Sequence, residues 1–301
     1  TLPPARRKMF DAAYFCSRMV QGSWFFLTGR KIDLKGRSVF ESALLGTGHT
    51  LRAAVFLLPY LLLDAVVLKK LRAVVGGAFR GTVSGGGALP PYVDEFFNYI
   101  GIPVLEGYGM TETTPVTAVR TNRKLIIGTV GPPCLKTEFR VIDLETGETL
   151  YPDPNRRGGG RGLKGELHVR GPQVMKGYYK APEETGRVLR DGWMNTGDIG
   201  MITYNDCVKI LGRSKETIVL LSGENVEPIP IEDKLKESPT IHHCMVVGND
   251  EKHLSALVVP SLEYFQANGY AEVETLEELN RNDAVHDEIA REVKQRVSAQ
   301  T

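Results

Sequence analysis

The most constraining part of the sequence lies between residues 79 and 113, where short apolar runs alternate with glycine-rich turns. Residues 80–83 have the character of a short strand and run into Ser-Gly-Gly-Gly-Ala at 84–88. Pro90 and Pro91 then open a segment in which apolar side chains recur at helical spacing through residues 93–100. Residues 102–105 form the next apolar strand. This order of strand, turn, helix and strand predicts a parallel α/β sheet.

The rest of the chain divides into regions with different residue patterns. Its 301 residues, 42% of them hydrophobic, are enough for about two domains. Residues 1–127 carry the α/β part, and residues 128–212 hold short strand-like runs between glycine and proline turns, which predict a small β-barrel-like subdomain. Residues 213–301 are expected to form a small α+β domain. We therefore predict a large domain over 1–212 followed by a smaller one.

Charge and cysteine content narrow the functional classes. With 37 basic and 36 acidic side chains, the protein has no strong field of one sign to attract nucleic acid. The 4 cysteines are far apart and include no C-x-x-C pair, so neither a disulfide framework nor a zinc site is indicated. A cytoplasmic protein without a nucleic-acid partner is expected.

One apolar run, residues 53–68, raises the question of a membrane. It is interrupted by Pro59 and Asp64, and by itself it is too short to span a bilayer. Because it is apolar on all sides, we expect a buried helix that Pro59 opens and the glycines at 76–77 end. A peripheral contact with the membrane is the alternative.

Two glycine-rich segments are candidates for ligand binding. The turn at 84–88 lets backbone amides approach a flat or anionic ligand, although alone such a segment is often only a turn. Residues 106–113 (Glu-Gly-Tyr-Gly-Met-Thr-Glu-Thr) follow the next parallel strand. Open α/β sheets bind ligands at the carboxyl ends of their strands. The two segments are therefore expected to meet in one crevice.

The second of these segments contains a useful combination of side chains. Gly107 and Gly109 leave the ring of Tyr108 accessible for stacking on a base. Thr111 offers a hydroxyl to a phosphate, and Glu112 offers a hard oxygen ligand for Mg²⁺. A core tyrosine and a surface glutamate are the alternatives, but the combination within five residues favours a site.

Two further segments end in charged residues. Residues 191–198 finish at Asp198, which can accept hydrogen bonds from both hydroxyls of a ribose. Residues 211–216 place Arg213 and Lys215 at the predicted domain boundary, and a guanidinium suits ribose or phosphate recognition. A turn-forming aspartate and solvated linker charges are the ordinary alternatives.

Taken in order, these motifs resemble the adenylate-forming superfamily of acyl-CoA synthetases, luciferases and peptide-synthetase adenylation domains. The resemblance covers roughly residues 80–260. The segments most similar to bacterial long-chain fatty acyl-CoA synthetases are 165–171, 175–179, 195–198 and 222–228.

The resemblance implies a role for each motif residue on the nucleotide side: Gly86, Gly87, Ala88, Gly107, Tyr108, Gly109, Thr111, Glu112, Asp198 and Arg213. The first three would lie along the adenine and acyl pocket, although the family more often has alanine and then proline where this chain has Gly87 and Ala88. The next three would hold adenine. Thr111 would contact the α-phosphate, Glu112 would bind Mg²⁺, and Asp198 with Arg213 would hold the ribose.

The resemblance also assigns two residues to the smaller domain. Lys215 matches the hinge about which that domain turns between two half-reactions, and Gly223 matches a loop brought to the coenzyme A side. These two roles are implied by the resemblance alone.

The implied function is ATP-dependent activation of a fatty acid. The carboxylate would attack ATP to give acyl-AMP and pyrophosphate, and coenzyme A would then displace AMP, with ATP, Mg²⁺ and coenzyme A as cofactors or co-substrates. An acyl-carrier-protein ligase, a fatty acyl-AMP ligase, an aryl-CoA ligase or a non-catalytic nucleotide-binding module are the alternatives. An oligomer is compatible with all of them.

The chain departs from the family pattern at two places. No lysine-containing phosphate loop is found before the glycine turn at 84–88, and Lys294, in an expected helix, is a poor match for the family's last lysine. We therefore expect a C-terminal portion of the large domain followed by a truncated small one. These residues alone are expected to retain weak AMP affinity without completing adenylation.

Overall fold

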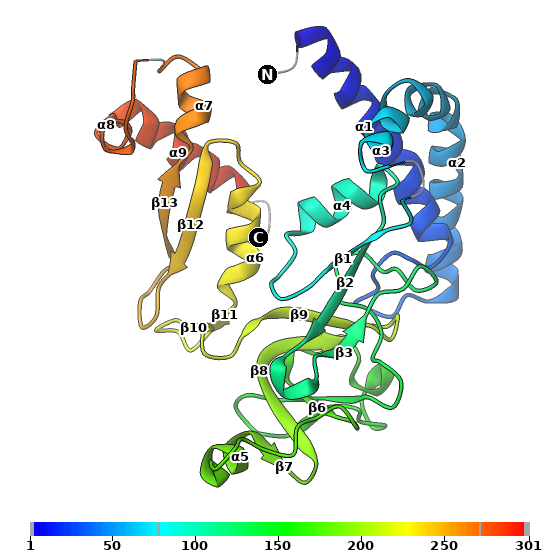
Figure 1. The fold of residues 1–301 in the computed structure, drawn as a ribbon, viewed down its shortest axis with the longest axis vertical. Helices are drawn as coiled ribbons and strands as arrows, with labels where there is room; N and C mark the ends of the chain where they lie inside the picture. The colour runs from blue at the N-terminus through cyan, green and yellow to red at the C-terminus, as the bar shows by residue number, and fades with distance from the viewer. Residues whose placement is uncertain (1–2, 77–78, 271, 298–301) are drawn as a thin grey trace. The chain divides into compact units, whose positions relative to one another are not determined.

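A computed structural model describes residues 3–76, 79–270 and 272–297 (Figure 1). The chain divides into two compact units. The first comprises Thr1–Thr196 and Gly200–Ile210, and the second comprises Gly197–Ile199 and Leu211–Thr301. The two are described separately below.

The first unit opens with two long helices that pack against each other, α1 (Pro4–Leu27) and α2 (Val39–Leu63) (Figure 1). Ser38 begins α2 through a capping box, in which its side chain accepts a hydrogen bond from the Glu41 amide and the Glu41 carboxylate accepts one from the Ser38 amide. Stacking of Phe26 on His49, with ring centroids 4.0 Å apart, joins the two helices.

The prediction that Pro59 opens a helix is wrong. Pro59 lies inside α2, which continues as the π-helical turn η1 (Asp64–Leu68) and then α3 (Lys69–Val74). Leucines on both sides of Pro59 favour the helix, which outweighs its missing N–H. The Arg72 guanidinium donates two hydrogen bonds to the carboxylate of Asp64, the first residue of the π turn, at 2.8 and 2.7 Å. The helix ends before Gly76, whose φ is 87°, and Gly77 lies outside the described residues.

The expected burial of this helix is also wrong. No residue of α2, which the structure describes throughout, is buried, and ten of its large apolar side chains are exposed: Val39, Phe40, Leu44, Leu45, Leu51, Val55, Leu57, Leu58, Leu61 and Leu62. The continuous helical stretch Val39–Val74 has 36 residues, and its most apolar 18-residue window has a mean hydropathy of 2.0. By length and composition alone this whole stretch could cross a membrane, which the run 53–68 by itself is too short to do, and only 6% of its most apolar window is buried.

The predicted parallel pair of strands is confirmed. Strand β1 (Thr82–Ser84) runs parallel to β2 (Val104–Gly109), with Ser84 opposite Glu106, and α4 (Pro91–Tyr99) connects them. Strand β3 (Val116–Val119) adds an antiparallel neighbour to β2. The chain reverses between β2 and β3 through the 3₁₀ turn η2 (Thr111–Thr113), after which Thr114 takes a left-handed conformation with a φ of 50°.

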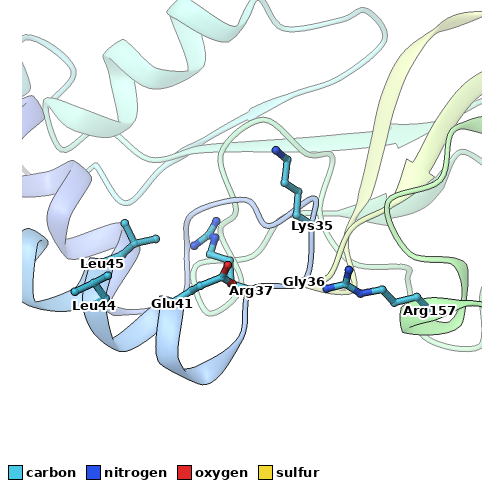
Figure 2. Close-up of a pocket in the computed structure, with 7 residues that line it drawn as sticks. All are labelled: Lys35, Gly36, Arg37, Glu41, Leu44, Leu45 and Arg157. Carbon is cyan, nitrogen blue, oxygen red and sulfur yellow. The ribbon is translucent and has the colours of Figure 1, made fainter.

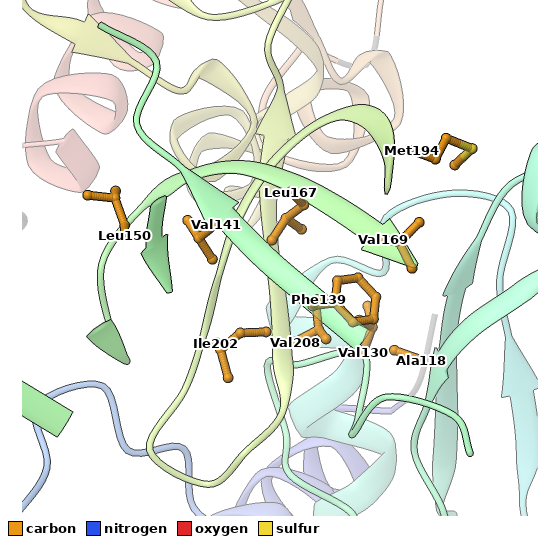
Figure 3. Close-up of a cluster of buried hydrophobic side chains, with 10 residues drawn as sticks. All are labelled: Ala118, Val130, Phe139, Val141, Leu150, Leu167, Val169, Met194, Ile202 and Val208. Atoms are coloured by element: carbon orange, nitrogen blue, oxygen red, sulfur yellow. The ribbon is translucent and has the colours of Figure 1, made fainter. Parts of the chain in front are cut away.

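The predicted β subdomain is confirmed as a sheet of six strands. Their order is β5 (Thr149–Tyr151), β4 (Glu138–Ile142), β6 (Gly165–Arg170), β8 (Trp193–Ile202) and β7 (Leu189–Arg190), with β9 (Val208–Arg213) also paired with β8. The turn η3 (Arg157–Gly160) and helix α5 (Pro182–Val188) lie in its connections. Apolar side chains from several of these strands form one buried cluster (Figure 3).

The second unit has the expected α+β character. It contains β10 (Ile218–Val219), β11 (Asn225–Val226), α6 (Pro228–Lys236), β12 (Ile241–Val247), β13 (Ser255–Pro260), α7 (Leu262–Ala267), α8 (Leu276–Asn280) and α9 (Asp283–Val297). Helix α9 begins at Asp283, and the side chain of the preceding residue, Asn282, accepts a hydrogen bond from the Ala284 amide at 3.0 Å.

The buried cluster of Figure 3 makes a testable prediction for stability. Leu167 is fully buried in it, so Leu167→Ala should lower the free energy of unfolding of the first unit by about 2–5 kcal/mol. Leu135→Ala removes a leucine that is 89% exposed and should change it by less than about 0.5 kcal/mol. Urea unfolding followed by tryptophan fluorescence reports this unit, because Trp24 and Trp193 both belong to it. Equal effects of the two substitutions would contradict the assigned core.

Candidate functional site

The structure places the glycine turn beside the end of β2. A Cβ atom on Gly85 would lie 3.5 Å from the Gly107 carbonyl oxygen, so the two backbones are close neighbours. At the far end of the turn, the Leu89 amide faces a Glu106 carboxylate oxygen at 3.4 Å. Residues 85–88 are exposed. The parallel register of β1 and β2 thus brings both candidate segments to one edge of the sheet.

Only some of the glycines in these segments are required by the backbone. Gly86 has a φ of +84°, in the left-handed region that favours glycine. A Cβ atom on Gly109 would overlap the backbone of Pro115. Around Gly87, by contrast, a Cβ atom would meet nothing within 4 Å among the described residues. The space at Gly87 is therefore compatible with a larger side chain.

Tyr108 has a structural role besides any role toward a ligand. Its ring is partly buried and packs against the cluster of Figure 3, and its backbone carbonyl accepts a hydrogen bond from the Thr117 hydroxyl at 3.1 Å. The ordinary interpretation of Tyr108 as a core residue thus holds for part of the ring. Packing on one side also fixes the orientation of the ring at the end of β2.

Thr111 and Glu112 lie in η2, immediately after β2. Thr111 is exposed, whereas Glu112 is half-buried and held from both its backbone and its side chain. The Glu112 carbonyl accepts a hydrogen bond from the Met175 amide at 2.8 Å, and its Oε1 accepts one from the Tyr178 hydroxyl, also at 2.8 Å. These contacts tie η2 to the segment 175–179.

Tyr178 is a residue that the sequence analysis missed. It belongs to a segment already noted for its family resemblance, but no sequence signal pairs it with Glu112, which lies 66 positions earlier. The hydrogen bond to the Glu112 carboxylate, aided by burial, raises the pKa of Tyr178 above its usual value. The hydroxyl therefore stays protonated and orients one oxygen of Glu112.

The donor set at η2 fits a magnesium ion bound together with a phosphate. Mg²⁺ commonly takes one or two carboxylates, phosphate oxygens and water, and Glu112 and Thr111 offer oxygen donors of that kind. No group of three or more histidine, cysteine, aspartate or glutamate side chains within the described residues is arranged to hold a metal alone. A site here would thus depend on oxygens from the nucleotide.

The remaining candidates lie in the second unit. The buried carboxylate of Asp198 pairs with the Arg213 guanidinium, Oδ1 to Nε at 3.6 Å, while the arginine side chain remains 71% exposed. Lys215 is exposed in the turn after β9. Gly223 is exposed in the turn between β10 and β11, with a φ of +81°. The structure therefore brings the two proposed ribose ligands together in this unit.

A separate open cavity of about 460 Å³ lies in the first unit and is lined by Lys35, Gly36, Arg37, Glu41, Leu44, Leu45 and Arg157 (Figure 2). None of the candidate residues lines it. Glu41, its acidic side chain, is engaged in the capping box with Ser38, and those hydrogen bonds lower the pKa of Glu41. We therefore place the candidate site at the strand ends.

Comparison with known proteins identifies the family. A model of the AMP-binding enzyme family matches residues 12–179, which include the glycine turn and η2, and a model of the AMP-binding enzyme C-terminal domain matches residues 215–300. The chain belongs to the AMP-binding enzyme family. The suggested resemblance to adenylate-forming enzymes is thereby confirmed.

Curated relatives of this chain include two chloroplast proteins of Arabidopsis thaliana. It is 45% identical to the probable acyl-activating enzyme 16 over 70% of this chain and 29% of that protein. It is 41% identical to the long-chain-fatty-acid–[acyl-carrier-protein] ligase AEE15 over 69% of this chain and 29% of that protein. It is also 36% identical to the long-chain-fatty-acid–CoA ligase FadD15 of Mycobacterium bovis, over 73% and 33%. The matched part thus spans a third or less of each relative.

Solved structures confirm the fold class. A crystal structure of an ATP-bound RpMatB-BxBclM chimera superimposes with a TM-score of 0.58 and 30% identity, over 78% of this chain and 43% of the chimera. The fold is therefore that of the adenylate-forming enzymes, with part of the large α/β domain and its β subdomain followed by the C-terminal domain.

The contact between Glu112 and Tyr178 generates a prediction of its own. Glu112→Gln removes the negative charge that favours the protonated phenol, so the pKa of Tyr178 should fall toward the usual value of about 10. NMR titration of ring-labelled tyrosine measures this change. Glu183→Gln, which removes an exposed carboxylate from α5, is the matched control and should leave the titration of Tyr178 unchanged. An unchanged titration midpoint of Tyr178 in the Glu112→Gln variant would contradict the hydrogen bond between these two side chains.

Proposed function

We propose that this chain carries the nucleotide side of an enzyme that activates a long-chain fatty acid with ATP. In the first half-reaction the carboxylate attacks the α-phosphorus, forming acyl-AMP and releasing pyrophosphate. In the second, a thiol attacks the acyl carbon and AMP leaves. The observation that carries this proposal is the meeting of the glycine turn with the end of β2, inside the region matched by the AMP-binding model.

Each residue at that edge has a defined task in the proposal. The turn over Gly86–Ala88 and the backbone of Gly107–Gly109 border the adenine, with the ring of Tyr108 stacked on it. The hydroxyl of Thr111 donates to an α-phosphate oxygen. Glu112, oriented by Tyr178, contributes an oxygen ligand to Mg²⁺, which when bound offsets negative charge on the phosphates.

The second unit supplies the remaining roles. The Asp198 carboxylate accepts hydrogen bonds from the ribose hydroxyls, and Arg213, paired with it at 3.6 Å, offers N–H donors to the same sugar. Lys215 acts as the hinge at the start of a small mobile domain over 213–301, following the large domain over 1–212. Gly223 lies on the side that receives coenzyme A.

Two acceptors for the acyl group remain as candidates. Coenzyme A is the first, supported by the 36% identity to a protein named as a CoA ligase. Acyl carrier protein is the second, favoured by the 41% identity to a protein named as an acyl-carrier-protein ligase. When a full-length protein that includes this chain receives labelled fatty acid, MgATP and both acceptors, the thioester that accumulates distinguishes the two.

The stacking role of Tyr108 makes a direct prediction for nucleotide binding. Tyr108→Ala should weaken AMP binding by about 1–3 kcal/mol, the usual contribution of stacking between a base and an aromatic side chain. Tyr108→Phe keeps the ring and should retain the affinity. Isothermal titration of the 301-residue protein with AMP in the presence of MgCl₂ measures both changes.

Tyr179→Ala is the matched control, because Tyr179 is 87% exposed and should leave AMP affinity unchanged. Urea unfolding of each variant checks that the fold is intact. If folded Tyr108→Ala binds AMP as well as the unsubstituted protein, the proposed position of adenine is wrong.

A further inference from the structure

A buried arginine lies directly behind the candidate site. Arg120 follows β3, and its side chain is fully buried. All five N–H groups of its guanidinium face acceptors: Asp94 Oδ1 at 2.7 Å, Asp94 Oδ2 at 2.8 Å, Glu106 Oε2 at 2.8 Å, the Val104 carbonyl at 3.5 Å and the Thr129 carbonyl. Such complete pairing fixes the position of the guanidinium on every side.

The two carboxylates around Arg120 join several segments of the first unit. Asp94, in α4, also accepts hydrogen bonds from the Gly128 amide at 3.0 Å and from the Asn98 side chain at 2.8 Å. Glu106 belongs to β2, and the Arg120 amide donates to its carbonyl at 2.9 Å. Arg120 thus connects the helix that follows the glycine turn with the strand that leads to Tyr108.

Glu106 links this cluster to the candidate site itself. One of its oxygens accepts from Arg120, and the other faces the Leu89 amide at 3.4 Å, immediately after the glycine turn. The next residue along β2 is Gly107, against which the turn packs. Glu106 therefore immediately precedes Gly107 in β2, and its carboxylate contacts the residue that follows the glycine turn.

We propose that Arg120 and Glu106 form a positioning pair, in which the guanidinium fixes the Glu106 carboxylate so that it holds the glycine turn against the end of β2 in the nucleotide-binding arrangement. This inference rests on the nucleotide function proposed above. Neither residue contacts the ligand. Their effect on binding passes through Leu89 on one side and Gly107 on the other.

The pair also makes the arrangement sensitive to pH. Burial raises the pKa of Glu106 to about 7, the negative charge of Asp94 adds to this effect, and the positive charge of Arg120 opposes it. Both carboxylate oxygens face N–H donors, so a proton on either one meets a donor and displaces Arg120 or Leu89. Acidification through this range should therefore loosen the turn and weaken nucleotide binding.

The same proton has the opposite effect on folding stability. Because the pKa of Glu106 is higher in the folded protein than its ordinary value of 4.5, protonation favours the folded state. Its stabilising contribution is fully present below about 4.5 and is lost as the pH rises through about 7. If the cluster were purely structural, stability and nucleotide affinity would change in the same direction with pH. A positioning pair makes them change in opposite directions as the pH rises.

The experiment compares the 301-residue protein with Glu106→Gln between pH 5.5 and 8.5. The side-chain amide of the Glu106→Gln variant places an NH₂ group toward one of the same donors, so this variant mimics the protonated acid at every pH. In the unsubstituted protein, AMP affinity should rise about tenfold with pH, the scale of one hydrogen bond, and the Leu89 amide resonance should titrate in ¹H–¹⁵N spectra. The Glu106→Gln variant should bind AMP with the same weak affinity at every pH, and its Leu89 amide resonance should not titrate.

Two other variants complete the test. Arg120→Lys keeps the positive charge but loses the planar guanidinium that reaches Asp94 and Glu106 together. This variant should weaken AMP binding at every pH. Glu138→Gln breaks the exposed pair with Arg170, 2.6 Å apart, and should leave both AMP affinity and the Leu89 titration unchanged. Urea unfolding over the same pH range supplies the stability profile.

The outcomes separate the two proposals. A Leu89 resonance that does not titrate, or that titrates equally in Glu106→Gln, overturns the positioning pair. An AMP affinity that rises and falls together with stability also overturns it. If Leu89 titrates as expected but AMP does not bind at any pH, the pair holds the turn as described and the proposed nucleotide function fails.

Discussion

The parallel pairing of β1 with β2 is the constraint on which the candidate site depends. Ser84 lies opposite Glu106 in this register, so the glycine turn after β1 and the segment from Gly107 onward leave the sheet at the same edge. A shift of one residue would turn every side chain of β2 to the opposite face. Tyr108 would then lose its packing on the core, and Glu106 would lose Arg120.

A buried charge cluster enforces that register at a cost. Arg120 and its two carboxylates are removed from water, and such groups are tolerated in a protein interior only when their hydrogen bonds are satisfied. Apolar residues at these positions could give comparable stability. Retaining charges behind the glycine turn is consistent with a role in geometry, since the direction of a hydrogen bond specifies position more sharply than apolar contact.

Local patterns in the sequence predict much of the fold. Pro90 and Pro91, followed by apolar side chains at helical spacing, located α4 between the parallel strands. The same signals failed at Pro59, because a proline predicts a helix boundary only when the flanking residues do not favour a longer helix. Burial of α2 could not be predicted either, since apolar composition does not show whether a covering segment is present.

The candidate site is predictable to a smaller extent. The two glycine segments were found from their positions after successive strands, whereas Tyr178 reaches Glu112 across 66 positions and Arg120 reaches Asp94 across 26. Such contacts depend on tertiary packing, for which no spacing rule exists. The roles assigned to individual site residues, and the boundary at residue 212, remain proposals.

The central claim is that adenine nucleotides bind where the glycine turn meets the end of β2. Amide hydrogen exchange of the 301-residue protein, with and without saturating AMP and MgCl₂, tests it most directly. The account predicts slower exchange in residues 84–89 and 106–113. Protection confined to the cavity around residues 35–45, or no protection in either segment at a concentration where AMP is bound, would contradict it.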